Sequence, residues 1–244
     1  MTDMSTDDYG QHQSDCGLLI ANSNPAPSRE AEYNRWHEMH LQEAVRSIGG
    51  LTVAQRYRLS EHQRPDAKPS LWSYLTLYEL QGDVDVIHDA TRLLRDSGVH
   101  ALHDSAIVND YIGHVYTPIG NPYRKPGWTG RHEVSHIMVV RSNPVPGRDD
   151  EYNQWYAIHL REVVDNIDGY VGAQRYRLHL SQGPGVPASR WEYVAIYEIA
   201  SDDLILVHRS NYAARAAGVF TPWAGILADD HVAHVFTLIG TYHR

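Results

Sequence analysis

The chain has 244 residues, with 42% hydrophobic and 21% charged residues, which is typical of a globular protein with one large domain or two smaller ones. Its net charge of −9 argues against nucleic acid or an anionic membrane as partner, because both favour basic surfaces. The single cysteine, Cys16, excludes an intramolecular disulfide and a cysteine-rich metal cluster.

The N-terminal segment, residues 1–15, is acidic and polar and has no apolar core, so we expect a disordered tail rather than a secretory signal. No stretch of the chain approaches the roughly 18 to 20 apolar residues of a membrane helix. We therefore predict a cytoplasmic protein that does not bind membranes.

Residues 16–120 contain an alternation of strand and helix signals. The apolar run 17–21 predicts a strand, and the segment from Ser28 to Gly49 predicts a helix. Residues 54–59 (AQRYRL) alternate as a strand does, and a polar loop containing prolines separates them from a third strand at 72–80. A second helix at 84–95 and a strand that ends at Gly120 complete the unit.

The second half of the chain repeats this unit. Residues 151–178 match residues 32–59 at a constant offset of 119, with 16 of 28 positions identical. Residues 121–133, rich in proline and glycine, form the predicted linker, and residues 134–244 form the second repeat. The order β-α-β-β-α-β is the ferredoxin-like plan, whose helices cover one sheet face only. We therefore predict an α+β protein in which two ferredoxin-like repeats form an intramolecular pseudo-dimeric barrel.

The first helix of each repeat has the strongest chemical signal. Tyr33, Trp36, His40 and Glu43 lie on one helix face at i, i+3, i+7 and i+10. Tyr152, Trp155, His159 and Glu162 repeat the pattern. Aromatic rings beside an ionisable group are typical of a pocket wall, although a histidine here can equally be a structural residue that holds helix to sheet.

Other residues add to this candidate pocket. His114 and His234, on the last strands, could meet the helix histidines or be satisfied core histidines. Tyrosines on the second and third strands provide aromatic surface and hydroxyl groups: Tyr57, Tyr74, Tyr176 and Tyr193. The strand arginines Arg56, Arg58, Arg175 and Arg177 are expected to pair with Glu79 and Glu198 within the barrel.

The sequence has no HExxH motif and no glycine-rich phosphate loop, so we expect neither a metal nor a nucleotide cofactor. The pattern EYNxWxxxHLxE, followed by glycine and AQRYRL, resembles the EthD-like branch of the dimeric α+β barrel superfamily over nearly the whole chain after the tail. The resemblance implies a ligand pocket between helices and sheet in each repeat. It also implies site roles for the tyrosine, tryptophan and histidine of the pattern, and a departure at His37, where the second repeat has Tyr156.

These features predict an enzyme without a cofactor that acts on a small aromatic or polyketide-like compound. His40 or His159 would be the general acid or base, Tyr33 or Tyr152 would stabilise an oxyanion, and Trp36 or Trp155 would stack on the substrate. The reaction would be that of a lyase or isomerase: elimination, decarboxylation, isomerisation or cyclisation. The alternatives are an oxygenase, either cofactor-free or dependent on haem, and a non-catalytic binding protein. The internal pseudo-dimer could assemble further into a homo-oligomer.

Overall fold

Each repeat contains four strands and two long helices in the order that the sequence predicts. The structure, a computed structural model, describes residues 15–96, 98, 101–182 and 185–244, so the predicted tail lies outside it except for Asp15. The first repeat comprises β1 (Cys16–Ser23), α1 (Glu30–Ser47), β2 (Leu51–Leu59), β3 (Tyr74–Gln81), α2 (Val84–Asp96) and β4 (Ile112–Arg124). The second comprises β5 (His136–Ser142), α3 (Asp149–Asn166), β6 (Tyr170–Leu178), β7 (Tyr193–Ile199), α4 (Leu204–Ala216) and β8 (Val232–His243).

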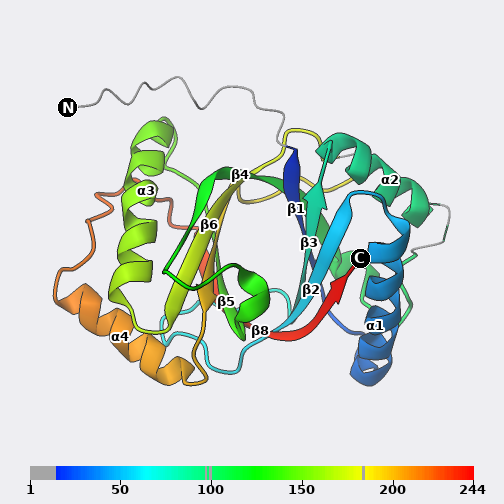
Figure 1. Ribbon diagram of the computed structural model, residues 1–244, viewed down its shortest axis with the longest axis horizontal. Coiled ribbons are helices and arrows are strands. Elements are labelled where there is room, and N and C mark those ends of the chain that lie inside the picture. Colours follow the sequence, from blue (N-terminus) through cyan, green and yellow to red (C-terminus); the bar gives the residue numbers. More distant parts are fainter. Residues whose placement is uncertain (1–14, 97, 99–100, 183–184) are drawn as a thin grey trace.

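The eight strands close into one antiparallel barrel in the order β1-β3-β2-β8-β5-β7-β6-β4. Two of its seams join the repeats, because β2 pairs with β8 and β4 pairs with β6. Helices α1 and α2 lie on one side of the barrel, and α3 and α4 lie on the other (Figure 1). The predicted α+β pseudo-dimeric barrel is therefore confirmed. None of the helices in the described part of the chain has the length and apolar character that a bilayer crossing requires.

Strand alternation divides the apolar residues into separate cores. On β2, Ala54 packs with Leu41 and Val45 of α1, whereas Tyr57 belongs to a cluster inside the barrel. This inner cluster takes residues from both repeats, such as Leu77 and Ile137. The helix-facing side of each sheet and the inside of the barrel are therefore distinct environments.

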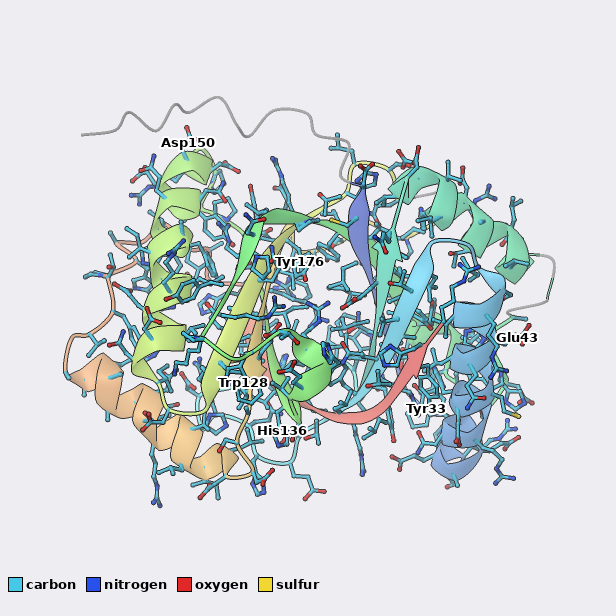
Figure 2. All side chains as sticks on the ribbon, in the orientation of Figure 1. Tyr33, Glu43, Trp128, His136, Asp150 and Tyr176 are labelled. Carbon is cyan, nitrogen blue, oxygen red and sulfur yellow. The ribbon has the colours of Figure 1, made fainter. Side chains whose placement is uncertain are left out.

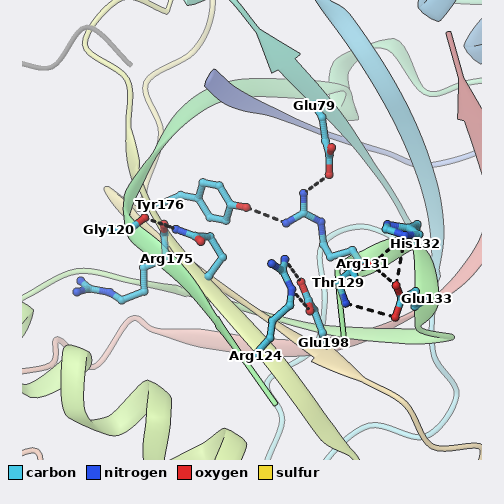
Figure 3. A network of polar contacts seen from close by, with 11 residues as sticks. Glu79, Gly120, Arg124, Thr129, Arg131, His132, Glu133, Arg175, Tyr176 and Glu198 are labelled. Atoms are coloured by element: carbon cyan, nitrogen blue, oxygen red, sulfur yellow. Dashed lines mark hydrogen bonds and ion pairs between the residues drawn. The ribbon is translucent and has the colours of Figure 1, made fainter. Parts of the chain in front are cut away.

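The linker closes one end of the barrel. Trp128 packs against the inner cluster, and Arg131, in a short helical turn at Arg131–Glu133, is buried with it. Arg131 Nη1 donates a hydrogen bond to the Tyr176 hydroxyl at 2.8 Å, and Nη2 lies 2.5 Å from Glu79 Oε1 (Figure 3). A segment predicted only as a connection thus forms part of the core.

The barrel ion pairs differ from those expected. Arg124, at the end of β4, holds Glu198 through Nε and Nη2 at 2.8 and 2.7 Å, and Arg131 holds Glu79 (Figure 3). The four strand arginines expected to pair with these glutamates contact other residues instead. Arg56 and Arg175 donate hydrogen bonds to Asn34 and Asn153, and Arg58 and Arg177 form ion pairs with Glu30 and Glu192. The expectation was wrong because these four arginines point to the helix side of the sheet, whereas the glutamates point into the barrel.

Candidate functional site

The second repeat holds a cavity of about 370 Å³ between α3, α4 and the helix-facing side of β5, β7 and β8. The loop between β2 and β3 of the first repeat completes its wall through Arg64, Asp66, Ala67 and Lys68. Asp66 accepts hydrogen bonds from Arg64 and from Tyr212 of α4, at 2.7 Å each, which fix this loop against the second repeat. Both repeats therefore contribute to one pocket.

His159 and Trp155 form part of this wall, one helical turn apart on α3. Their rings are stacked at 4.5 Å with an angle of 13°, as the i, i+4 spacing allows. Phe220 meets the imidazole edge-on at 5.4 Å. The aromatic and ionisable residues predicted for the second repeat thus do line a cavity.

The imidazole of His159 is held in its neutral form. Burial, together with the positive charge of Arg215, lowers its pKa to about 4, and the carboxylate of Glu162 offsets part of this effect. Nδ1 is buried, lies 3.7 Å from Glu162 Oε2, and has no hydrogen-bond partner among the described residues. Nε2 is therefore the ring nitrogen able to meet a ligand, and at neutral pH it can accept a proton.

Glu162 is itself positioned by Thr221. The Thr221 amide and hydroxyl donate hydrogen bonds to the two carboxylate oxygens, at 2.9 and 2.5 Å. The Thr221 carbonyl accepts a hydrogen bond from Trp155 Nε1 at 2.9 Å. A chain of contacts thus joins the stacking wall, the carboxylate and the histidine. Thr221 and Arg215 were not predicted from the sequence. For Thr221 there was a signal, since its counterpart in the first repeat is Ala101.

The predicted tyrosines lie elsewhere. The hydroxyls of Tyr33 and Tyr152 are buried and share hydrogen bonds with Ser23 and Ser142, at 2.6 and 2.8 Å. Tyr152 is not among the residues that line the cavity, whereas Tyr156, one turn further along α3, is. Tyr74 and Tyr193 pack against Tyr33 and Tyr152, with ring centroids 5.0 and 4.8 Å apart. The hydroxyls of Tyr33 and Tyr152 therefore face the helix–sheet core rather than the cavity.

The strand residues on the other face lie inside the barrel. Tyr57 and Tyr176 belong to its inner cluster. His114 and His234 point to the same side, and each Nε2 lies 2.8 Å from a backbone carbonyl, of Pro187 and Lys68 respectively. The helix-facing positions beside them are Val115 and Val235. The sheet therefore separates these histidines from those of the helices.

The first repeat keeps the stacked tryptophan and histidine but not the partly buried glutamate beside them. His40 stacks on Trp36 at 4.7 Å and 17°. Glu43, the counterpart of Glu162, is exposed, and both Tyr33 and Glu43 are labelled on α1 in Figure 2. His37 takes the place of Tyr156, and burial together with Arg56 lowers its pKa to about 2.

One group of potential metal ligands lies at the surface of the first repeat. Ligand atoms of Glu32, His103 and Asp104 lie within 4.8 Å of one another. Arg29 pairs with both carboxylates, at 2.8 Å to Glu32 and 2.9 Å to Asp104. An ion-pair network accounts for this group without a metal.

Comparison with known proteins supports the fold. No protein-family model matches the chain, and no curated protein matches it. Among solved structures, it is similar to an anthrone oxidase-like protein at 8% identity and a TM-score of 0.60, over 93% of this chain and 92% of the other. A candidate monooxygenase from Fusobacterium nucleatum gives 9% identity and a TM-score of 0.57, over 94% of each chain. A chlorite dismutase from Candidatus Nitrospira defluvii with bound imidazole gives 9% and 0.51, over 93% and 92%. The chain thus shares the fold of dimeric α+β barrel proteins.

Proposed function

We propose that the chain is a cofactor-independent enzyme that transfers protons on a small aromatic or polyketide-like compound, and that the cavity of the second repeat is its active site. The observation that carries this proposal is the neutral His159 in the cavity wall, stacked on Trp155 and backed by Glu162. The resemblance of the helix pattern to EthD-like proteins supports it. The open cavity favours an enzyme over a binding module whose tryptophans fill the pocket.

In the proposed mechanism the substrate ring packs against Trp155 and Phe220. His159 Nε2 removes a proton from an acidic C–H or O–H group, and Glu162 stabilises the imidazolium that forms. The guanidinium of Arg215, which lines the cavity, faces the resulting enolate or phenolate. Arg215 takes the oxyanion role that the sequence suggested for Tyr152, because the Tyr152 hydroxyl is bonded to Ser142. Return of the proton at another atom gives isomerisation, and loss of a leaving group gives elimination.

An oxygenase is the second candidate. Two of the similar structures carry names of oxidative enzymes, an anthrone oxidase-like protein and a candidate monooxygenase. The same deprotonation by His159 would give a carbanion, which can react with dioxygen without a cofactor. The two candidates therefore share their first step and differ in the fate of the carbanion.

A haem-dependent oxygenase would also use His159. Its Nε2 could ligate the haem iron, and its Nδ1 lies beside a carboxylate, which is how metal-bound histidines are commonly oriented. Arg64, Lys68 and Arg215 line the same cavity and could pair with propionates. Bound haem would supply oxygen activation. His114 and His234 fit this role less well, because each Nε2 already contacts a backbone carbonyl.

The test begins with an absorbance spectrum of the purified protein, and a Soret band would replace the cofactor-free proposal by the haem alternative. The colourless protein is then incubated with anthrone and with phenolic ketones in deuterated buffer. We expect enzyme-dependent deuterium incorporation at the acidic carbon, observed by NMR and abolished in His159→Gln. Consumption of dioxygen in the same sample would favour the oxygenase. Exchange that persists in the folded His159→Gln variant would contradict the role of His159.

A further inference from the structure

A buried arginine lies inside the barrel, at the end opposite to the linker. Arg141, on β5, is 4% exposed, and its Nη2 donates a hydrogen bond to Asn22 Oδ1 on β1 at 2.7 Å. Asn22 and Arg141 are equivalent positions of the two repeats, separated by the offset of 119. Equivalent residues of two related units contact each other only near the axis that relates them. Arg141 therefore lies close to the pseudo-twofold axis.

The charge of this guanidinium has no counter-ion in the part of the chain that the structure describes. Within residues 15–96, 98, 101–182 and 185–244, the Arg141 side chain forms no ion pair and only the one hydrogen bond to Asn22. Burial lowers its pKa, yet an arginine stays protonated in proteins. A buried cation without a partner is costly, so an anion that reached it would be bound favourably.

A cavity of about 120 Å³ gives access to this charge. Aromatic and apolar side chains form most of its wall, and none of the described residues that line it is acidic. Ile20, Trp72, Ile112, Tyr116 and Trp191 lie beside Arg141, and the further polar groups are Asn22, His114, Ser189 and Arg190. The Arg141 guanidinium lies 5.6 Å from the centre of the Trp72 ring. A neighbouring cavity of about 160 Å³ shares Trp72, Trp191 and Arg141 but contains Asp230, which disfavours an anion there.

We propose that this cavity at the barrel end binds a small aromatic carboxylate. The guanidinium N–H groups not used by Asn22 can donate a bidentate pair of hydrogen bonds to the carboxylate, and the indole rings can pack on the planar body of the ligand. His114 Nε2 donates to the Pro187 carbonyl, so the neutral ring presents Nδ1 as an acceptor for a phenolic hydroxyl. The ligand class is thus a benzoate or hydroxybenzoate rather than inorganic phosphate, which the apolar wall does not suit. The site lies inside the barrel and does not share a residue with the His159 cavity.

The single chain makes such a site possible. In a symmetric dimer an arginine at this position would face its own copy across the axis, and two like charges would meet in a buried place. The tandem repeat instead has asparagine on one side and arginine on the other.

The test measures binding of benzoate and 4-hydroxybenzoate to the full chain by calorimetry, with benzamide and inorganic phosphate as comparison ligands. We expect saturable binding of both carboxylates, weakened at least about tenfold in Arg141→Gln. The matched control is Arg177→Gln, an exposed strand arginine that pairs with Glu192 and lines neither cavity; it should change the affinity less than about threefold. His159→Gln should leave this binding unchanged, which separates it from the proposed enzymatic activity. Equal affinity for benzamide, or unchanged affinity in Arg141→Gln, would overturn the proposal.

Thermal denaturation distinguishes a ligand-binding role of Arg141 from a purely structural role. Because the buried charge lacks a partner, Arg141→Met should melt at or above the temperature of the unmodified protein when no ligand is present. Benzoate should raise the melting temperature of the unmodified protein and not that of the variant. A variant that melts lower but still responds to benzoate would assign Arg141 a structural role only.

Discussion

The two repeats share the stack of tryptophan and histidine but differ in what lies behind the histidine. In the second repeat Glu162 is held by Thr221 next to His159. In the first repeat the equivalent Glu43 is exposed, and Ala101 has no hydroxyl to hold it. Both copies keep the residues that shape the first helix and its packing. The pair of a glutamate and a hydroxyl that holds it, Glu162 and Thr221, occurs only in the second repeat. Duplication thus permits one pocket to specialise.

We expect the largest difference in activity between variants of the two equivalent helix histidines, His159 and His40. We expect His159→Ala to lower kcat/KM by about 10²- to 10⁴-fold, the usual contribution of a positioned general base. His40→Ala, the matched change in the first repeat, should change it less than about threefold, because His40 does not line the cavity proposed as the active site. Steady-state kinetics on the substrate found by deuterium exchange provides the measurement. Equal losses in both variants would show that the repeats are equivalent.

A second comparison concerns the two ion pairs inside the barrel. Arg124→Met leaves Glu198, which is 1% exposed, buried without a partner, and should cost about 3 to 5 kcal/mol of unfolding free energy. Arg131→Met should cost less, about 1 to 3 kcal/mol, because the Glu79 side chain is 40% exposed and keeps contact with water. Urea denaturation of both variants measures the difference. A larger loss in Arg131→Met would mean that the linker, rather than β4, stabilises the barrel.

A smaller effect should come from the contact behind Glu162. Thr221→Ala removes one of the two hydrogen bonds to the carboxylate and should lower kcat/KM about tenfold, equivalent to roughly 1.4 kcal/mol. Thr221→Ser keeps the hydroxyl and should restore most of the rate. The reciprocal change, Ala101→Thr, should leave the rate unchanged, which kinetic assay of all three variants can check. A Thr221→Ala enzyme with full activity would remove this contact from the mechanism.

The pH dependence should sharpen the assignment further. Since the pKa of His159 lies near 4, below its usual 6.5, the neutral base predominates above pH 4 and activity should fall as the pH drops through that value. The unfolded chain binds the proton more readily, so the His159 contribution to stability is complete above about pH 6.5 and is lost between 6.5 and 4. An NMR titration of the imidazole gives the midpoint. The Glu162→Gln variant should show a lower midpoint, because the Glu162 carboxylate raises the pKa of His159. A midpoint near 6.5 in the unmodified protein would contradict the burial of the ring.

Much of the fold was predictable because it depends on local and repeated patterns. The constant offset between EYNRWHEMHL and EYNQWYAIHL revealed the duplication, and the alternation of AQRYRL revealed that the strand has two faces. The partners of Glu79 and Glu198 were not predictable, because alternation shows that two residues share a face but not which face is the inside of the barrel. The course of the linker, and with it Arg131, depends on barrel closure.

The sequence likewise predicted some features of the site and not others. The spacing of Trp155 and His159 along one helix determined their stack, because residues four apart on a helix are neighbours whatever surrounds them. The inward direction of His114 and the engagement of the Tyr152 hydroxyl by Ser142 depend on how distant strands pack. Thr221 lies 59 residues from Glu162 along the chain.

The sequence by itself determined the duplication, the ferredoxin-like order of elements and the aromatic stripe of each first helix, because these features repeat over a few residues or over one fixed offset. The tertiary structure alone decided which face of each strand is interior, which arginines meet which glutamates, and that Thr221 and the loop at residues 64–68 complete the cavity of the second repeat. It also brought Asn22 and Arg141 together. Such contacts join residues far apart in the chain, and only closure of the barrel fixes their distances.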